Sequence, residues 1–311
     1  MKVLSLFDGI SCGMVALERA NIEVEQKDYF ASEIKPIAIK CSQDNYPNLT
    51  RIGDVTKVHY WNGTLYTEKG SFDVGKIDLL IGGSPCQNFS QASAIQGDYS
   101  GLQGSKSKLF YEFLRILKEV NPKYFLLENV AMSKQKKQML DDYLGVCGIA
   151  INSDLVSFQN RPRIYWSNIP NITIPKDKQI SFQDYKENDI EELKKYKVKR
   201  TPSREKMWGN GGSGKWACKN ITYADKIGCV TRKQDRCPNS GLIEFEDFCR
   251  YLTRKEIEMA QTLPIGYTDC LTYNQMQDVC GDGWTVDVIA HIFKGLMENE
   301  LPTNIRPKSG M

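Results

Sequence analysis

The sequence lacks the residue patterns that hold metals, staple small domains or cross membranes. It has no CxxC pair and only two histidines, His59 and His291, while its ten cysteines are scattered. Neither a zinc site nor a disulfide framework is therefore expected. No apolar run approaches membrane-spanning length, and the opening residues MKVLSLF are typical of a buried strand rather than a signal peptide. These absences predict a protein of the reducing cytoplasm with no metal and no membrane partner.

Net charge is also low, but its distribution is uneven. The total is +3, whereas the segment 194–236 contains thirteen lysines and arginines against Glu205, Asp225 and Asp235. The lysines of 194–199 alone favour a solvated helix face. The whole segment, with Trp208 and Trp216 among glycines, is more typical of a surface that contacts phosphates and bases.

The first half of the chain alternates short apolar runs with helical patterns, which predicts βαβ units and a parallel sheet. Strands are expected at 3–7, 29–32, 77–83 and 123–129, and helices at 13–20, from Pro36, and at 109–120. A final helix is expected at 285–297. The fold class is therefore α/β, with a doubly wound, mostly parallel sheet.

After about residue 168 the periodicity gives way to Lys/Glu-rich and Gly-rich sequence, and it returns near Glu246. This change predicts a small domain inserted into a larger one. We expect a catalytic domain at 1–168, an inserted domain at 169–248 and a C-terminal return to the catalytic domain at 249–311.

Each predicted strand ends in polar residues, and the carboxyl ends of parallel strands converge on one site. Cys86 follows the strand 77–83 in the segment SPCQNFS, and Glu128 ends the strand 123–129. A lone cysteine is more often buried and structural, but polar, turn-forming surroundings favour a reactive thiol in a closing loop. An unpaired carboxylate at a strand end is costly, so Glu128 is either a capping or salt-bridging residue or part of a site. Arg161 and Arg163, two residues apart, would share one side of an extended chain, as structural ion pairs or as a planar recognition site.

Two further segments favour a ligand at the same edge. The turn FDGISCG (7–13) has two glycines that let backbone amides approach a ligand, although it is not a GxGxxG motif. Glu33 suits ribose hydroxyls, and Asp54 suits an exocyclic amine. Taken singly, each acid is more often a helix cap or a solvated residue.

Together, the segments FDGISCG, SEI, GDV, GGSPCQNFS, ENV, QNRPRIYW and GDGWTVDVIAHIF resemble the cytosine-5 DNA methyltransferase family in order and spacing. The likeness covers essentially all of the chain outside about 170–240. The short variable region and the C-terminal motifs are also similar to the catalytic domain of the animal de novo methyltransferases. Asp282, where the family more often has asparagine, and Trp284, where it has a small residue, depart from the pattern.

The resemblance implies the S-adenosylmethionine-dependent methyltransferase fold with a target-recognition insertion, and S-adenosylmethionine as the methyl donor. It implies that Cys86 is the nucleophile, that Glu128 contacts cytosine nitrogen 3, and that Arg163, supported by Arg161, holds oxygen 2. Pro85 belongs to the nucleophile loop, which Asn129 would brace. The implied donor-binding residues are Phe7, Asp8, Gly9, Ile10, Gly13, Glu33, Ile34, Asp54, Val55, Asp78, Gly83, Trp284 and Thr285.

The implied substrate is a cytosine flipped out of double-stranded DNA. Candidate DNA contacts are Gln87, Ser90, Arg204, Arg232, Lys233 and Arg236. A companion restriction endonuclease would fit a cytoplasmic enzyme of prokaryotic or phage origin. Two alternatives stay open: an RNA cytosine methyltransferase of similar architecture, and a non-catalytic DNA-binding accessory. An NAD-dependent enzyme is disfavoured because GxGxxG is absent.

Overall fold

A seven-stranded sheet is the centre of the computed structural model, which describes residues 1–84, 108–208, 218–233 and 238–297. The strand order is β3-β2-β1-β7-β8-β10-β9, with parallel pairing from β3 to β8 and antiparallel pairing of β10 with both neighbours. The strands are β1 (Val3–Leu6), β2 (Tyr29–Ser32), β3 (Thr50–Arg51), β7 (Leu79–Gly83), β8 (Tyr124–Val130), β9 (Ile149–Asn152) and β10 (Pro162–Ser167).

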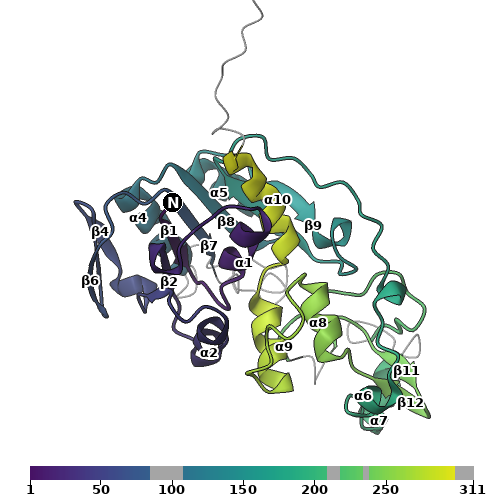
Figure 1. Cartoon of the computed structure of the whole chain (residues 1–311). Helices are drawn as coiled ribbons and strands as arrows, with labels where there is room; N and C mark the ends of the chain where they lie inside the picture. The colour runs from purple at the N-terminus through teal and green to yellow at the C-terminus, as the bar shows by residue number, and fades with distance from the viewer. Residues whose placement is uncertain (85–107, 209–217, 234–237, 298–311) are drawn as a thin grey trace, which may run out of the picture.

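Both faces of this sheet are covered by helices, because alternate strand side chains point to opposite sides. Val3 and Leu79 belong to one apolar core, and their neighbours Leu4 and Leu80 belong to the other. The first core contains residues of α1 (Cys12–Arg19), α2 (Pro36–Asn45) and α10 (Val286–Met297), and the second contains residues of α4 (Lys108–Val120) and α5 (Lys134–Leu144). Figure 1 shows α10 beside α1. The predicted doubly wound, mostly parallel α/β fold is confirmed.

The middle of the sheet contains a topological switch point. From β1 the chain moves to β2 on one side, and it later returns to β7 on the other side. In such sheets the loops that leave the two strands separate, and a crevice opens at their carboxyl ends. The turns after β1, β2, β7 and β8 therefore meet at one edge.

The segment after β10 forms a small lobe, at the lower right of Figure 1. It contains α6 (Ile190–Lys194), α7 (Pro202–Met207), β11 (Ile243–Phe245) and β12 (Phe248–Arg250). Val198, Cys218, Leu242 and Cys249 form a separate apolar cluster there. Helices α8 (Arg254–Ala260) and α9 (Tyr273–Asp282) then lead the chain back to α10. The proposed domain boundaries stay a prediction.

A three-stranded antiparallel sheet, which the sequence pattern did not predict, is formed by the part of the chain between β3 and β7. It consists of β4 (His59–Trp61), β5 (Thr64–Thr67) and β6 (Gly70–Asp73), and β4 packs against α4. Most of its side chains are exposed or half-buried. The strands therefore lack the alternation of apolar and polar residues by which a half-buried strand is recognised in a sequence.

Candidate active site

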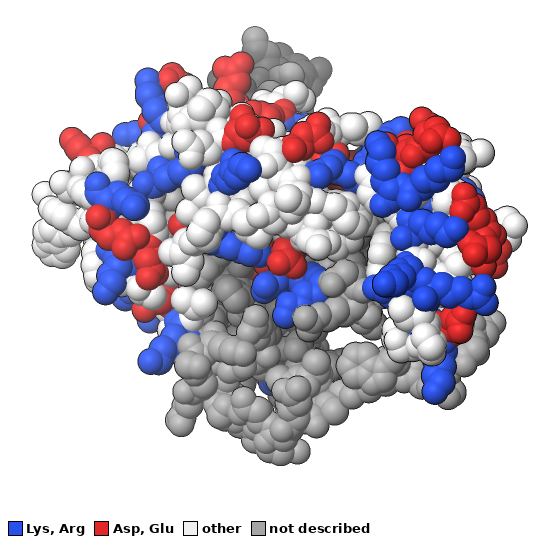
Figure 2. Space-filling view, turned by 90° about the horizontal axis from the view of Figure 1, so that it is seen from below, with Lys and Arg blue, Asp and Glu red and all other residues white. Residues whose placement is uncertain are grey.

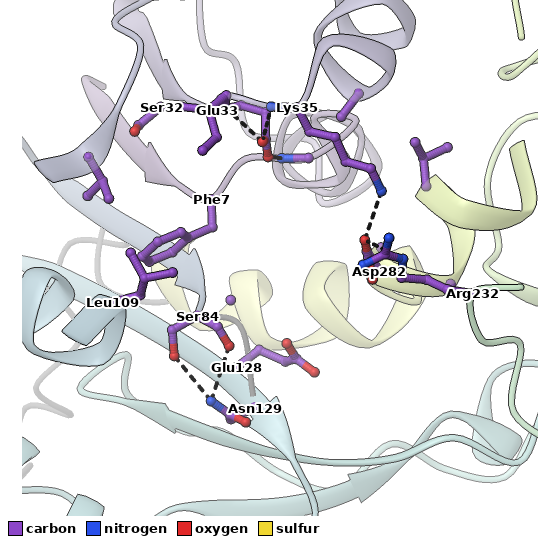
Figure 3. Close-up of a pocket in the computed structure, with 18 of the residues that line it drawn as sticks. Phe7, Ser32, Glu33, Lys35, Ser84, Leu109, Glu128, Asn129, Arg232 and Asp282 are labelled. Carbon is purple, nitrogen blue, oxygen red and sulfur yellow. Dashed lines mark hydrogen bonds and ion pairs between the residues drawn. The ribbon is translucent and has the colours of Figure 1, made fainter. Parts of the chain in front are cut away.

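A cavity of about 350 Å³ opens at the carboxyl edge of the sheet (Figure 3), a volume typical of small-molecule sites. Its walls come from the ends of β1, β2, β7 and β8 and from the C-terminal end of α9. Twelve of the predicted site residues line it: Phe7, Gly9, Glu33, Ile34, Asp54, Val55, Gly83, Glu128, Asn129, Arg161, Arg163 and Arg232. The turn from β1 to α1 and the end of β8 thus border one continuous space.

The turn after β1 has an unusual backbone. Phe7, Gly9 and Ser11 have φ angles of 57°, 61° and 60°, in the left-handed region that suits glycine best. A β-carbon built on Gly9 would meet no atom within 4 Å, so the peptide there borders open space. Its amide donates to Glu33 Oε2 at 2.8 Å, and this bond ties the turn to the end of β2.

The predicted acidic residues of the donor site each use part of their carboxylate internally. Glu33 Oε1 accepts from the amides of Ile34 and Lys35, each at 2.8 Å. Asp54 accepts from the amide of Thr56 at 2.9 Å. A carboxylate has about four acceptor positions, so both groups retain capacity for hydroxyl or amine donors. Ile34, with 67% of its side chain exposed, provides an apolar surface between them and the solvent.

The second end of the cavity is formed where β7 and β8 finish side by side, with Gly83 paired to Glu128. Glu128 Oε1 lies 2.9 Å from Arg163 Nε of β10, and both side chains are largely buried. Asn129 Nδ2 donates to the carbonyl of Ser84 at 3.3 Å and to its hydroxyl at 3.1 Å (Figure 3). Ser84, the last described residue before the predicted nucleophile Cys86, is thereby tied to β8.

Five predicted residues lie outside the described part of the chain: Pro85, Cys86, Gln87, Ser90 and Arg236. Ser84 lines the cavity, and Cys86 follows it by two residues. The roles assigned to these five residues stay predictions.

Four of the eight described cysteines do not have the environment of a reactive thiol. Burial raises the pKa of Cys12 to about 12 and that of Cys249 to about 12, and burial also raises the pKa values of Cys41 and Cys280. A nucleophilic cysteine needs a low pKa and access to substrate. These four thiols are packing groups.

Two of the acids assigned to donor binding have other roles in the structure. Asp8 accepts from the hydroxyls of Ser5, Ser11 and Tyr29 at 2.6 to 2.7 Å, and burial raises its pKa. Its side chain holds the β1–α1 turn together and is absent from the cavity lining. Asp78 precedes β7 and accepts from the amide of Lys2 at 2.8 Å. It stands at the amino end of the strand, opposite the cavity, so its placement beside the donor is not retained.

Four further predicted donor residues pack beneath or beside the cavity without lining it. Ile10 is 1% exposed, and its carbonyl accepts from the Tyr267 hydroxyl. A β-carbon at Gly13 would come within 2.5 Å of Ile81 Cδ1. The Thr285 hydroxyl donates to Gln261 Oε1 at 2.9 Å. Trp284 donates its indole N–H to Glu128 Oε2 at 3.1 Å, a contact between distant segments that the sequence did not indicate.

The two arginines of the QNRPRIYW segment have different surroundings. Arg163 pairs with Glu128. Arg161 is 3% exposed, and its guanidinium donates to the carbonyls of Val230, Gly281 and Gly283 at 2.7 to 3.0 Å. The guanidinium of Arg161 therefore holds these backbone segments in place.

An ion pair at the cavity wall was missed by sequence reasoning. Lys35 Nζ lies 3.0 Å from Asp282 Oδ2, and Arg232 Nε lies 3.7 Å from the same oxygen (Figure 3). Asp282 had been noted only as a departure from the family pattern. The sequence did offer one indication of a charged group here, because Lys35 follows the predicted site residue Glu33 by two residues.

The basic segment 194–236 is less uniformly positive in space than in sequence. Lys194, Lys195 and Lys197 pair with Glu191, Glu192 and Glu246, and Lys226 Nζ donates to two backbone carbonyls. Figure 2 shows lysine and arginine side chains gathered on the small lobe, with acidic side chains among them.

The structure describes three of the predicted DNA contacts. Arg204 Nη1 donates to the carbonyl of Lys199 at 3.1 Å. Arg232 lines the cavity, and the amide of Lys233 donates to Asp278 Oδ1 at 3.4 Å. Arg232 is therefore the one of these three that borders the cavity.

Among the described residues, no helix combines the length and hydrophobicity needed to cross a membrane. Within the same residues, no three His, Cys, Asp or Glu side chains cluster in a way that would hold a metal ion.

Comparison with known proteins gives one family. The model of the C-5 cytosine-specific DNA methylase family matches residues 1–298. The orphan methyltransferase M.Rho11sI of Bacillus phage rho11s is 31% identical over 193 residues, 58% of this chain and 35% of the relative. The type II methyltransferase M.NlaIV of Neisseria lactamica is 38% identical over 132 residues, 42% of this chain and 28% of the relative. The chain thus spans about a third of the length of these curated relatives.

Solved structures share the fold. The Entamoeba histolytica methyltransferase EhMeth has a TM-score of 0.71 at 17% identity, covering 96% of this chain and 98% of that one. The Schizosaccharomyces (S. pombe) Dnmt2 methyltransferase has a TM-score of 0.69 at 18% identity, covering 96% and 99%. At these identities the likeness shows the architecture alone.

Proposed function

The chain belongs to the C-5 cytosine-specific DNA methylase family, and from this premise we propose that it transfers a methyl group from S-adenosylmethionine to carbon 5 of a cytosine in duplex DNA. The observation that carries the proposal is the single cavity that joins the turn after β1 to the paired Glu128 and Arg163. A two-substrate transfer needs both reactants beside each other. Ser84, two residues before Cys86, lines that same cavity.

The residues that follow β1, β2 and β3 fit the methyl donor. Gly9 borders open space, Glu33 and Asp54 retain acceptor positions, and Ile34 offers an apolar surface. We assign Glu33 to ribose hydroxyls, Asp54 to the exocyclic amine of adenine, and Phe7 and Val55 to the remaining wall. When bound, the donor supplies an electrophilic methyl group on a sulfonium.

The opposite end activates the cytosine. Carbon 5 is a poor nucleophile in an aromatic ring, so the Cys86 thiolate first forms a carbon–sulfur bond at carbon 6. The displaced electron pair moves towards nitrogen 3 and oxygen 2, where Glu128 provides a proton or hydrogen bond and Arg163 a positive charge. The electron pair at carbon 5 would then form a bond to the methyl group, while the methyl–sulfur bond of the donor breaks and leaves its electron pair on sulfur as a neutral thioether. Loss of the carbon 5 proton to a base, for which water is a candidate, returns electrons to the ring and expels the thiolate.

The reacting atoms of cytosine are hidden inside stacked DNA, so the nucleotide must leave the helix, at a cost of roughly a few kcal/mol. The proposed closing loop is 87–104, which contains Gln87 and Ser90. The small lobe would contact phosphates, which set register, and a few base edges, which set sequence preference. Arg204, Arg232, Lys233 and Arg236 are the proposed contacts.

Two rival functions are separated by direct assays. An RNA cytosine methyltransferase of the same architecture would methylate a tRNA pool at least as well as duplex DNA. A non-catalytic accessory would bind DNA without methyl transfer. The family match and the DNA methyltransferase relatives favour DNA as substrate.

Duplex DNA with 5-fluorocytosine at the target position is expected to form a stable covalent complex with the chain when the donor is present. Fluorine cannot leave carbon 5 as a proton does, so the carbon–sulfur bond at carbon 6 persists. Denaturing electrophoresis detects the complex, and peptide mapping identifies the attached residue. Attachment at any residue other than Cys86, or no adduct in the presence of donor, would count against the mechanism.

Neutralising Arg232 and Arg236 to glutamine is expected to weaken DNA binding and flatten its salt dependence. Each lost phosphate contact lowers the slope of log K against log[salt] by about 0.9. Titrations of a labelled duplex at several salt concentrations measure the slope. Lys27→Gln is a single-charge control away from the cavity, because Lys27 pairs with Glu25 and is 72% exposed at the amino end of β2. An unaltered slope in the double variant would place the DNA contacts elsewhere.

Bisulfite sequencing of DNA from cells that express the chain would report activity and recognition sequence together. A companion restriction endonuclease would cleave at that same sequence. We place the protein in the cytoplasm of a bacterial cell, since relatives of the chain come from bacteria and their phages.

A further inference from the structure

The carboxylate of Glu128 has two side-chain donors that come from different parts of the fold. Arg163 Nε lies 2.9 Å from Oε1 and belongs to the adjacent strand β10. Trp284 Nε1 donates to Oε2 at 3.1 Å, and it lies 156 residues farther along the chain, between α9 and α10. A buried carboxylate requires partners for both oxygens. With Arg163 alone, the Glu128 carboxylate could still rotate, and the hydrogen bond from the Trp284 indole fixes that rotation.

Gly83 provides the clearance that this contact needs. A β-carbon on Gly83 would lie 2.8 Å from Trp284 Nε1 and 3.0 Å from Glu128 Oε2. Gly83 lies in β7, where the extended backbone accepts any residue, so space rather than conformation explains glycine here. Gly13 lies on another side of the indole, 3.7 Å from Cζ3 by the same construction. The indole thus occupies a slot bounded by two glycines.

The backbone that carries Trp284 is held from the same segment that presents Arg163. Arg161 Nη2 donates to the carbonyl of Gly281 at 3.0 Å and to that of Gly283 at 2.8 Å. Arg161 is buried, and charge-assisted bonds of this kind are about twice as strong as neutral ones. The buried Thr285 hydroxyl anchors the other side, accepting from Ser153 Oγ at 2.9 Å. The backbone on both sides of the indole is therefore fixed, by Arg161 before it and by Thr285 after it.

We propose that Trp284 is a positioning residue that sets the orientation of Glu128 towards the cytosine, with Gly83 providing its clearance and Arg161 holding its backbone. This inference rests on the proposed methyl transfer, and it differs from a role as a wall of the donor site. The indole N–H can donate a single hydrogen bond, and the carboxylate of Glu128 accepts it. Removal of that bond frees the carboxylate to rotate away from nitrogen 3.

Trp284→Phe keeps an aromatic ring in the slot and removes the N–H. We expect kcat at saturating donor and DNA to fall about 10- to 100-fold, since a misplacement of about 1 Å can cost 10²-fold in rate. The Kd for S-adenosylmethionine should stay near its wild-type value. In a Glu128→Gln background the same change should produce no further loss, because Trp284 acts through that carboxylate.

Trp166→Phe is the matched control. Trp166 also donates its indole N–H to a carboxylate, Asp141 Oδ1 at 2.6 Å, but in the core on the other face of the sheet. Its loss should lower the thermal midpoint and leave kcat unchanged. Gly83→Ala tests the slot independently, and it should lower kcat as Trp284→Phe does.

The outcomes separate this inference from the proposed function. An active wild type whose Trp284→Phe variant loses donor affinity at unchanged kcat would overturn the positioning role alone. Multiplicative losses in Trp284→Phe and Glu128→Gln would overturn it as well. A folded wild-type chain without methyl transfer to any cytosine substrate would remove the proposed function and this inference with it.

Discussion

Replacement of Cys86 by serine is expected to abolish methyl transfer, with a loss of at least about 10⁴-fold in kcat, as when the nucleophile of a covalent mechanism is removed. The reaction starts with a thiolate that adds to carbon 6, and a serine hydroxyl neither ionises near neutral pH nor attacks that carbon comparably. Binding of S-adenosylmethionine should be retained, because the residues assigned to it in the cavity follow β1, β2 and β3. Transfer of a radiolabelled methyl group and donor titration by calorimetry measure the two properties.

Cys147→Ser provides the matched control, since Cys147 is an exposed free cysteine between α5 and β9. Its turnover should equal that of the wild type. Unchanged turnover in Cys86→Ser would remove the mechanism altogether. A parallel loss of donor binding would show instead that the substitution disturbs the cavity as a whole.

Four strands of the sheet were predictable because their signals are local, whereas β3, β9 and β10 were not predicted. The strands at 29–32, 77–83 and 123–129 consist of apolar residues that end at polar or glycine residues, and helix 109–120 has apolar residues at helical spacing. Burial on both faces of a parallel sheet produces such runs. The sheet of β4 to β6 escaped prediction because its short strands are mostly exposed and have no such pattern.

The candidate site was predictable only in part, for a related reason. That strand ends meet at one edge follows from topology, and Glu33, Asp54, Glu128 and Arg163 do line one cavity. What each polar group does there depends on contacts between distant segments. The carboxylate of Asp8 accepts hydrogen bonds from three hydroxyls, including that of Tyr29 on the neighbouring strand β2. No motif reports such a pairing.

The same limit explains Arg161 and Trp284. The alternation of Arg161 and Arg163 predicts a shared side, but the carbonyls of Gly281 and Gly283 that capture Arg161 lie 120 and 122 residues away. Burial of a guanidinium is favourable only when its donors are satisfied, and these carbonyls satisfy them. Residues near the C-terminal end of α9 therefore contribute to the cavity through the backbone as well as through side chains.

Glu128→Gln is expected to lower kcat about 10²- to 10³-fold, the usual effect of removing one group that stabilises developing charge. An amide can neither carry the proton that nitrogen 3 needs nor balance the charge of Arg163. Both neighbours of the carboxylate, Arg163 Nε and Trp284 Nε1, are donors. Whichever way the amide is turned, its NH₂ group faces one of them, and one hydrogen bond is lost.

The appropriate control is Glu119→Gln on α4. Glu119 also pairs with an arginine, Arg115 Nη1 at 2.7 Å, and it accepts from the amide of Tyr60, but it does not line the cavity. That substitution should leave kcat unchanged, so the comparison separates loss of a carboxylate–arginine pair from loss of this one. Steady-state kinetics at saturating donor and DNA decide the matter. A Glu128→Gln variant as active as the Glu119→Gln control would mean that charge at nitrogen 3 is stabilised by some other group.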